Sequence, residues 1–215
     1  MSGTAKHLTD GMADAVEAFI DNHVSGTSAG QPFFLHYSHY AVHAPTQGRA
    51  DLVNKYQSKP DGAQHDNTTY AAMIEQMDQP LARLWDNLKD PNRDGDMSDD
   101  ISENTILIFT SDNGGDARTS NVPLRGAKGM FREGGIRVPL IIRWAGTTPE
   151  GVISDSVVHA VDFYPTFADL AGAALPAQGR DGESYAGVLT DFAQTVRTRT
   201  TDSYTHLTLP TSELL

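Results

Sequence analysis

The side chains best suited to chemistry lie in one stretch, residues 104–144, where polar and charged residues follow an apolar run. The run Ile106 to Phe109 predicts a buried strand, and Asp112 and Asn113 come shortly after it. Open α/β sheets bind ligands at the carboxyl ends of their strands, and calcium prefers carboxylate and amide oxygens. The sequence Asp-Asn-Gly-Gly is also good turn chemistry, so on these residues alone a metal site and a simple turn both fit.

A basic, glycine-rich loop follows this turn. Its cations are Arg125, Lys128, Arg132 and Arg137, and glycines stand between them. Cationic side chains together with closely approaching backbone suit an anion, so the loop predicts an anion-binding site. A second apolar run, residues 138–144, predicts another buried strand after the loop.

Three motifs in this stretch, TSDNGG, LRGAKG and EGGIRVPLI, resemble the later half of the catalytic domain of the sulfatases, a family with the alkaline-phosphatase-like fold. The segments PFFLHYSHYAVHAP, YAAMIEQMDQPLARLWDNL and VDFYPTFADLAG agree with the same family in the same order. Together the matching segments cover most of residues 8 to 190. The resemblance implies a sulfuric ester hydrolase acting on sulfate esters.

Site residues follow from this resemblance. It implies that Asp112 and Asn113 bind one Ca²⁺ ion and that Lys128 binds the sulfate group and takes part in catalysis. It also implies that His43, in an H-x-P sequence, contacts the ester oxygen as a catalytic and substrate-binding residue, with Arg125 as a further substrate-binding candidate. We expect His43, Asp112, Asn113 and Lys128 to converge on one concave surface.

Neighbouring charged residues have simpler interpretations. His36 and His39 fit surface or hydrogen-bonded structural roles. Glu133 and Arg137 fit an ion pair that shapes the basic loop.

A separate acidic loop resembles an EF-hand calcium loop in its first nine positions. The candidate ligands of this possible second calcium site are Asp90, Asn92, Asp94, Asp96 and Ser98. Position twelve is Ile101 instead of the usual bidentate Glu. A structural calcium site and a solvated acidic loop therefore both fit.

We predict an α/β fold, an alkaline-phosphatase-like sandwich with a mainly parallel central sheet flanked by helices, incomplete in this chain. Its strands include residues 32–37, 105–110 and 138–143, and its helices include residues 10–22 and 68–89. The buried stripe expected on the longer helix consists of Ile74, Met77, Leu81, Leu84, Trp85 and Leu88.

Composition sets the outer limits. The 215 residues contain 39% hydrophobic and 20% charged residues, enough for a packed core, and no cysteine, which excludes a thiolate metal site. The net charge of -12 disfavours a nucleic-acid partner. No apolar segment is long enough to span a membrane and no signal peptide is recognised, while the family implies a periplasmic or secreted protein.

We expect residues 1–202 to be a partial sulfatase catalytic domain that lacks the N-terminal nucleophile segment and the C-terminal subdomain. Residues 203–215 have no counterpart in the family and resemble a translated sequencing adapter, so we expect a non-native tail. The family nucleophile is formylglycine, made from Cys or Ser in a C/S-x-P-x-R motif that these residues do not contain. The chain as given is therefore expected to be inactive.

Two alternatives remain open at this point: a fragment of a related phosphodiesterase or phosphonate hydrolase, and a non-catalytic calcium-binding module. The expected partner is a sulfated small molecule or glycan, and the sequence does not separate these two substrate classes.

Overall fold

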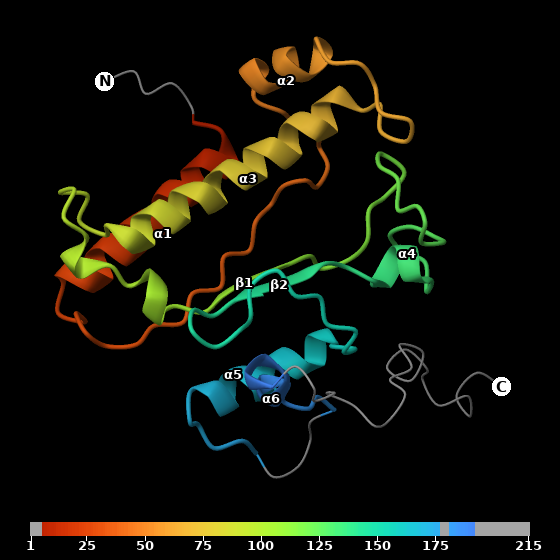
Figure 1. The fold of residues 1–215 in the computed structure, drawn as a ribbon. Coiled ribbons are helices and arrows are strands. Elements are labelled where there is room, and N and C mark those ends of the chain that lie inside the picture. The colour runs from red at the N-terminus through yellow and green to blue at the C-terminus, as the bar shows by residue number, and fades with distance from the viewer. Residues whose placement is uncertain (1–5, 177–180, 192–215) are drawn as a thin grey trace. The chain divides into compact units, whose positions relative to one another are not determined.

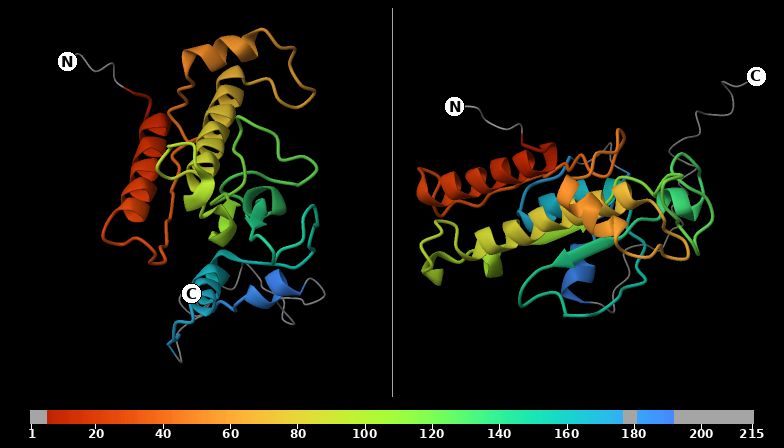
Figure 2. Two further views of the ribbon diagram at one scale, coloured as in Figure 1. Left: turned by 60° about the vertical axis from the view of Figure 1, so that its left-hand side comes forward. Right: turned by 90° about the horizontal axis from the view of Figure 1, so that it is seen from above.

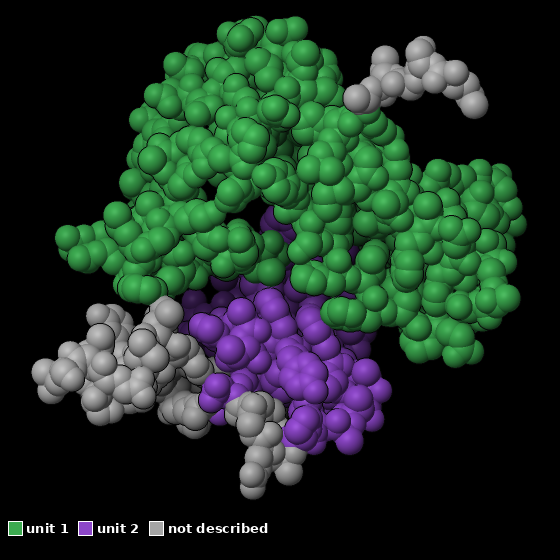
Figure 3. Space-filling view, turned by 180° about the vertical axis from the view of Figure 1, so that it is seen from behind, with its two compact units in different colours: residues 1–105, 110–139 green, residues 106–109, 140–215 purple. Residues whose placement is uncertain are grey.

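The computed structural model describes residues 6–176 and 181–191, which form helices, short 3-10 turns and a two-stranded sheet (Figure 1). The chain divides into two compact units, residues 1–105 with 110–139 and residues 106–109 with 140–215 (Figure 3). The first unit contains α1 (Leu8–Ser25), α2 (Ala50–Gln57), α3 (Thr68–Lys89), η1 (Met97–Asp99), η2 (Ser102–Asn104) and α4 (Glu133–Ile136). The second contains β1 (Leu107–Thr110) except for Thr110, which belongs to the first unit. It also contains β2 (Leu140–Arg143), η3 (Ala160–Asp162), α5 (Phe163–Leu170) and α6 (Ala186–Thr190).

In the first unit, α3 packs against α1 and α2, and both views show α1 and α3 side by side (Figures 1 and 2). The apolar residues buried between these helices are Ala13, Val16, Ile20, Leu52, Ala72, Met73, Leu84 and Leu88. Arg83 also joins the two long helices, since its guanidinium lies 2.7 Å from Asp14 and 2.6 Å from Glu17. Apolar burial supplies most of the cohesion, because such half-exposed ion pairs contribute little each.

The prediction for the longest helix is confirmed in its bounds and corrected in its orientation. Asn67 caps α3 by accepting the N–H of Tyr70 at 2.9 Å. Leu84 and Leu88 are buried as predicted, but Ile74 is 44% exposed. The face turned inward instead carries Ala72, Met73, Gln76, Pro80, Leu84, Asn87 and Leu88.

Polar partners explain why this face of α3 is buried. The side chain of Gln76 accepts the N–H of Arg49 at 3.1 Å, next to α2. That of Asn87 donates to Asp21 of α1 at 2.8 Å. Because of these hydrogen bonds, the two amide side chains can be buried at positions that the predicted apolar stripe did not include.

The second unit holds the sheet and a cluster of short helices. β1 and β2 pair with each other, which confirms the strands predicted at 105–110 and 138–143, although both are shorter and only partly buried. Asp162 is fully buried, and its carboxylate accepts the N–H groups of His159 at 2.8 Å and Glu183 at 2.9 Å. Its role here is structural, because its carboxylate holds the backbone of two other segments in place.

The strand predicted at residues 32–37 is wrong for the chain as described. From Phe33 to Tyr40 the residues alternate between partly buried and exposed, but no strand is assigned there. An apolar run becomes a strand only when a neighbouring strand satisfies its backbone groups, and the sheet of the described residues contains β1 and β2 alone.

None of the helices within residues 6–176 and 181–191 combines the length and apolarity that a membrane span requires.

Candidate functional site

The turn after β1 presents the expected calcium ligands to solvent. Asp112 is exposed, and in the described part of the chain its carboxylate has no hydrogen-bond or ion-pair partner. The hydroxyl of Ser111 closes this turn by donating to the backbone oxygen of Asn113 at 2.9 Å. The side-chain amide of Asn113 has no hydrogen bond in the described part of the chain.

Glycines let this turn cross the basic loop at very short range. The N–H of Gly114 donates to the carbonyl of Gly135 at 2.9 Å. A Cβ placed on Gly114 would lie 1.9 Å from the carbonyl oxygen of Gly134, and one placed on Gly134 would lie 2.2 Å from that of Gly126. Only residues without a side chain fit at this crossing.

Lys128 is joined to the same turn through its backbone. Its N–H donates to the carbonyl of Gly115 at 2.9 Å, while its side chain is exposed and has no ion-pair partner among the described residues. The pKa of Asp116 falls to about 2, chiefly because Arg118 donates to its carboxylate, with a smaller contribution from the charge of Lys128. Lys128 therefore lies close enough to the turn to act on it electrostatically.

Arg125 and Arg137, two other cations of the basic loop, make no side-chain hydrogen bond or ion pair with the Asp112 turn within the described residues. Arg125 is exposed, and its carbonyl accepts the N–H of Gly134 at 2.9 Å. The predicted pair of Glu133 and Arg137 forms at 3.4 Å, but both side chains are more than 60% exposed. A pair so open to water adds little stability, so the glycine crossing, and not this pair, shapes the loop.

The loop that carries His43 belongs to the first unit, as do the Asp112 turn and the basic loop. His43 is exposed, and its Nδ1 lies 2.9 Å from the carbonyl oxygen of Ala44. Its ring contacts the Tyr40 ring edge to face, with centroids 5.9 Å apart. In the described chain all these contacts are local, so the convergence of His43 with the Asp112 turn stays a prediction.

His39 differs from His43 in its surroundings. Its Nδ1 accepts the N–H of Ala41 at 3.2 Å and its ring contacts Tyr37. Burial lowers the pKa of His39, which favours the neutral ring and agrees with the structural interpretation.

The acidic loop uses its side chains to hold its own backbone. The carboxylate of Asp90 accepts the N–H groups of Asp94 at 3.2 Å and Gly95 at 2.9 Å. Farther along, Asp94 accepts from Asp96 and Asp96 from Ser98. Across residues 6–176 and 181–191, no three His, Asp or Glu side chains gather closely enough to hold a metal ion by themselves. The second calcium site stays a prediction.

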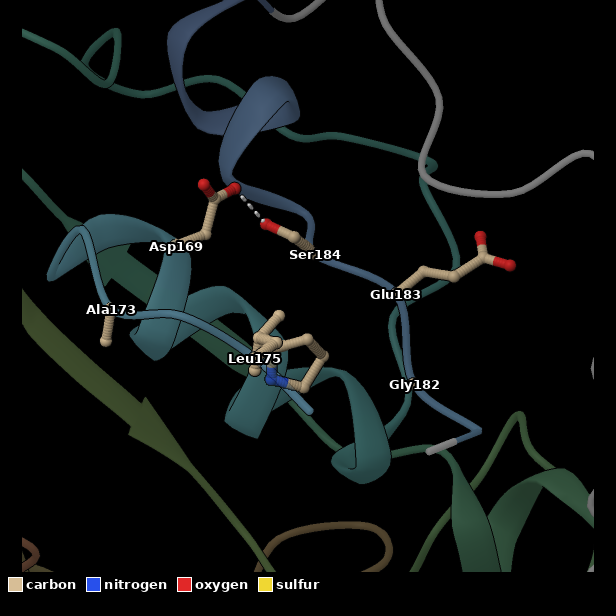
Figure 4. A pocket seen from close by; sticks show the side chains of 7 residues that line it. Asp169, Ala173, Leu175, Gly182, Glu183 and Ser184 are labelled. Atoms are coloured by element: carbon tan, nitrogen blue, oxygen red, sulfur yellow. Dashed lines mark hydrogen bonds between the residues drawn. The ribbon is translucent and has the colours of Figure 1, made fainter. Parts of the chain in front are cut away.

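A cavity of about 380 Å³ lies in the second unit, and none of the predicted site residues lines it. Its walls are Pro165, Asp169, Ala173, Leu175, Gly182, Glu183 and Ser184, and Ser184 donates to Asp169 at 2.7 Å (Figure 4). The hydroxyl of Ser184 is thus held by a carboxylate, with no histidine in the wall to activate it.

Sequence reasoning missed one residue at the site, Asn121. Its side chain binds the backbone of Gly115 and of Gly126, on both sides of the crossing. An amide in a polar run is usually assigned to a turn, and only the hydrogen bonds of the folded loop show this role.

Comparison with known proteins identifies the class. The sequence matches the model of the Sulfatase family over residues 2–173, so the chain belongs to the sulfatase family. It is 45% identical over 200 residues to a sulfatase of Formosa agariphila, covering 90% of this chain and 36% of that protein. It is 35% identical over 143 residues to mouse arylsulfatase J, covering 66% of this chain and 22% of that protein.

Among solved structures, the chain resembles Ps i-CgsB with a TM-score of 0.74 and 32% identity, covering 86% of this chain and 39% of that one. The same protein in complex with k-i-k-neocarrahexaose gives a TM-score of 0.69 and 33% identity, covering 80% and 36%. This likeness supports the mixed α/β assignment. The chain spans about a third of the length of the Formosa relative.

Proposed function

We propose that this chain forms the later part of a calcium-dependent, formylglycine-type sulfatase domain that hydrolyses sulfate esters. The observation that carries the proposal is the family match over residues 2–173 together with an exposed carboxylate, Asp112, and an exposed cation, Lys128, tied to one glycine turn. We also propose that the mainly parallel central sheet of the alkaline-phosphatase-like fold is completed in a longer protein.

Lys128 suits the sulfate group. An ammonium group without an ion-pair partner among the described residues is available to bind an incoming anion. Its backbone N–H is fixed on Gly115, so the side chain starts from a defined point beside the turn. We expect Lys128 to bind the sulfate oxygens more tightly as charge develops on them, with Arg125 in a supporting role.

His43 suits the ester oxygen. A carbonyl oxygen can only accept, so Nδ1 of His43 carries the proton that Ala44 accepts at 2.9 Å. The other ring nitrogen then faces away from this bond and, in the protonated ring, donates a hydrogen. We expect His43 to give that proton to the leaving alcohol.

The turn residues fit calcium in their chemistry. Asp112 and Asn113 offer hard oxygens, and neither side chain has a hydrogen bond within the described residues. Calcium takes about six to eight oxygens, so we expect further ligands from other parts of the longer protein. The bound ion would offset the negative charge of the sulfate group.

The substrate class that we propose is a sulfated glycan. The support is the likeness to Ps i-CgsB, whose structure holds k-i-k-neocarrahexaose. A periplasmic or secreted location fits a polymeric substrate outside the cell.

The experiment compares sulfate release by four proteins: the longer protein, the 215 residues alone and two lysine variants. The longer protein with its formylglycine should hydrolyse a sulfate ester, whereas the 215 residues alone, which contain no C/S-x-P-x-R motif, should not. Lys128→Ala should lower turnover about 10²- to 10³-fold, the usual loss for one charge-stabilising donor. Lys89→Ala, at the end of α3 with its ammonium over the Trp85 ring, is the charge-matched control and should keep wild-type turnover.

Two results would count against these assignments. Hydrolysis of phosphate esters without hydrolysis of sulfate esters would replace the proposed reaction with that of a phosphodiesterase. Equal turnover for Lys128→Ala and Lys89→Ala would remove the anion-binding role of Lys128.

A further inference from the structure

Asn121 occupies the centre of the contacts that join the Asp112 turn to the basic loop. Its Oδ1 accepts the N–H of Gly115 at 3.0 Å. Its Nδ2 donates to the carbonyl of Gly115 at 2.8 Å and to that of Gly126 at 3.3 Å. One side chain thus satisfies three backbone groups from two segments, using both hydrogens of its amide.

The two segments are those that carry the proposed ligands. Gly115 stands two residues after Asn113, and Gly126 two residues before Lys128. The carbonyl of Gly115 also accepts the N–H of Lys128 at 2.9 Å, so Asn121 and Lys128 share one acceptor. A displacement of Gly115 would therefore move the turn and the start of the Lys128 side chain together.

Close packing makes the backbone around Asn121 sensitive to small shifts. A Cβ on Gly115 would lie 2.3 Å from the methyl group of Thr119 and 3.0 Å from Oδ1 of Asn121. The carbonyl of Asn121 separately accepts the N–H of Leu124 at 2.8 Å, so the local turn does not depend on its side chain. Truncating the Asn121 side chain should therefore preserve the local turn at residues 121–124. It should remove the hydrogen bonds that join Gly115 to Gly126.

We propose that Asn121 is a positioning residue of the sulfatase site, which fixes the spacing between the calcium-binding turn and Lys128. The inference rests on the proposed function, because the spacing matters only if these residues act on one substrate. Supporting residues that orient ligands typically change metal affinity or activity about 10- to 100-fold when they are removed.

The test uses the longer protein and two variants of Asn121. Asn121→Ala should lower kcat/KM about 10- to 100-fold, mainly through kcat, and raise the calcium dissociation constant in calorimetry by a similar factor. It should also speed hydrogen exchange at the amides of Gly115 and Lys128. Asn121→Asp keeps an acceptor for Gly115 but has no hydrogen for the two carbonyl oxygens, so it should be impaired in the same three measurements.

The control separates positioning from stability alone. Asn67→Ala removes an asparagine that also bonds to backbone, at the start of α3, and should lower the melting temperature without changing kcat/KM, calcium affinity or exchange at Gly115 and Lys128. If Asn121→Ala behaves like Asn67→Ala in all three measurements, the proposal is wrong.

Failure of the proposed function would look different. If the unsubstituted longer protein releases no sulfate from any ester, the proposed reaction fails. The amide exchange of the Asn121 variants then decides whether this side chain fixes the crossing, since that readout needs neither substrate nor metal.

Discussion

Replacing Gly114 with alanine should disrupt the crossing of the Asp112 turn with the basic loop. The new Cβ would lie 1.9 Å from the carbonyl oxygen of Gly134 and 3.1 Å from the Cα of Gly135. Gly114 does not have a positive φ, so alanine fits its backbone conformation. The loss of stability therefore comes from the steric clash alone. The atoms in the way are backbone, which cannot rotate aside.

The size of the effect follows from this geometry. Restoring an ordinary contact requires the two backbones to separate by more than about 1 Å. The hydrogen bond from Gly114 to Gly135, now 2.9 Å, would then be lost. Overpacking costs about 1–3 kcal/mol and one lost hydrogen bond about 1 kcal/mol, so we expect a loss of about 2–4 kcal/mol.

Urea unfolding measures this loss. The chain has two tryptophans, Trp85 in the first unit and Trp144 in the second, so a Trp144→Phe background makes Trp85 fluorescence report the unit that contains Gly114. With a slope near 2 kcal/mol/M, the midpoint should fall by about 1–2 M. Gly11→Ala is the matched control: nothing lies within 4 Å of its Cβ, and alanine inside α1 should raise stability by about 0.5–1 kcal/mol. An unchanged midpoint for Gly114→Ala, with a raised one for Gly11→Ala, would refute the close crossing.

Two further predictions concern the core of each unit. Leu88 is 1% exposed, so Leu88→Ala should lower the free energy of unfolding by about 2–5 kcal/mol. Ile74 is 44% exposed, so Ile74→Ala should lower it clearly less. Equal losses in urea unfolding would contradict the orientation of α3. Burial, and to a smaller extent the charge of Asp162, raises the pKa of Tyr185 to about 12, so the folded state holds this proton more tightly than the unfolded state. The resulting stability is complete below about pH 10 and is lost as pH rises towards 12. Tyr185→Phe should therefore flatten the alkaline fall in melting temperature and, because the buried hydroxyl has no partner in the described chain, cost little at pH 7; an unchanged alkaline slope would disprove this.

The sequence by itself determined the elements whose signals are local. The helix predicted at residues 68–89 is found with these bounds as α3, and the structure adds that Asn67 caps its start. The apolar runs that became β1 and β2 were also readable, because each stands between polar segments. The family motifs placed Asp112 and Lys128 in one region before any contact was known.

Only the tertiary structure decided the features that depend on distant partners. Residues 32–37 have the composition of a strand, but pairing requires a neighbouring strand that no local signal supplies. The buried face of α3 depends on where α1 and α2 pack, which brought Gln76 inside and left Ile74 in contact with water. The role of Asn121 depends on hydrogen bonds to Gly115 and Gly126, which only the folding of the loop brings within reach of one side chain.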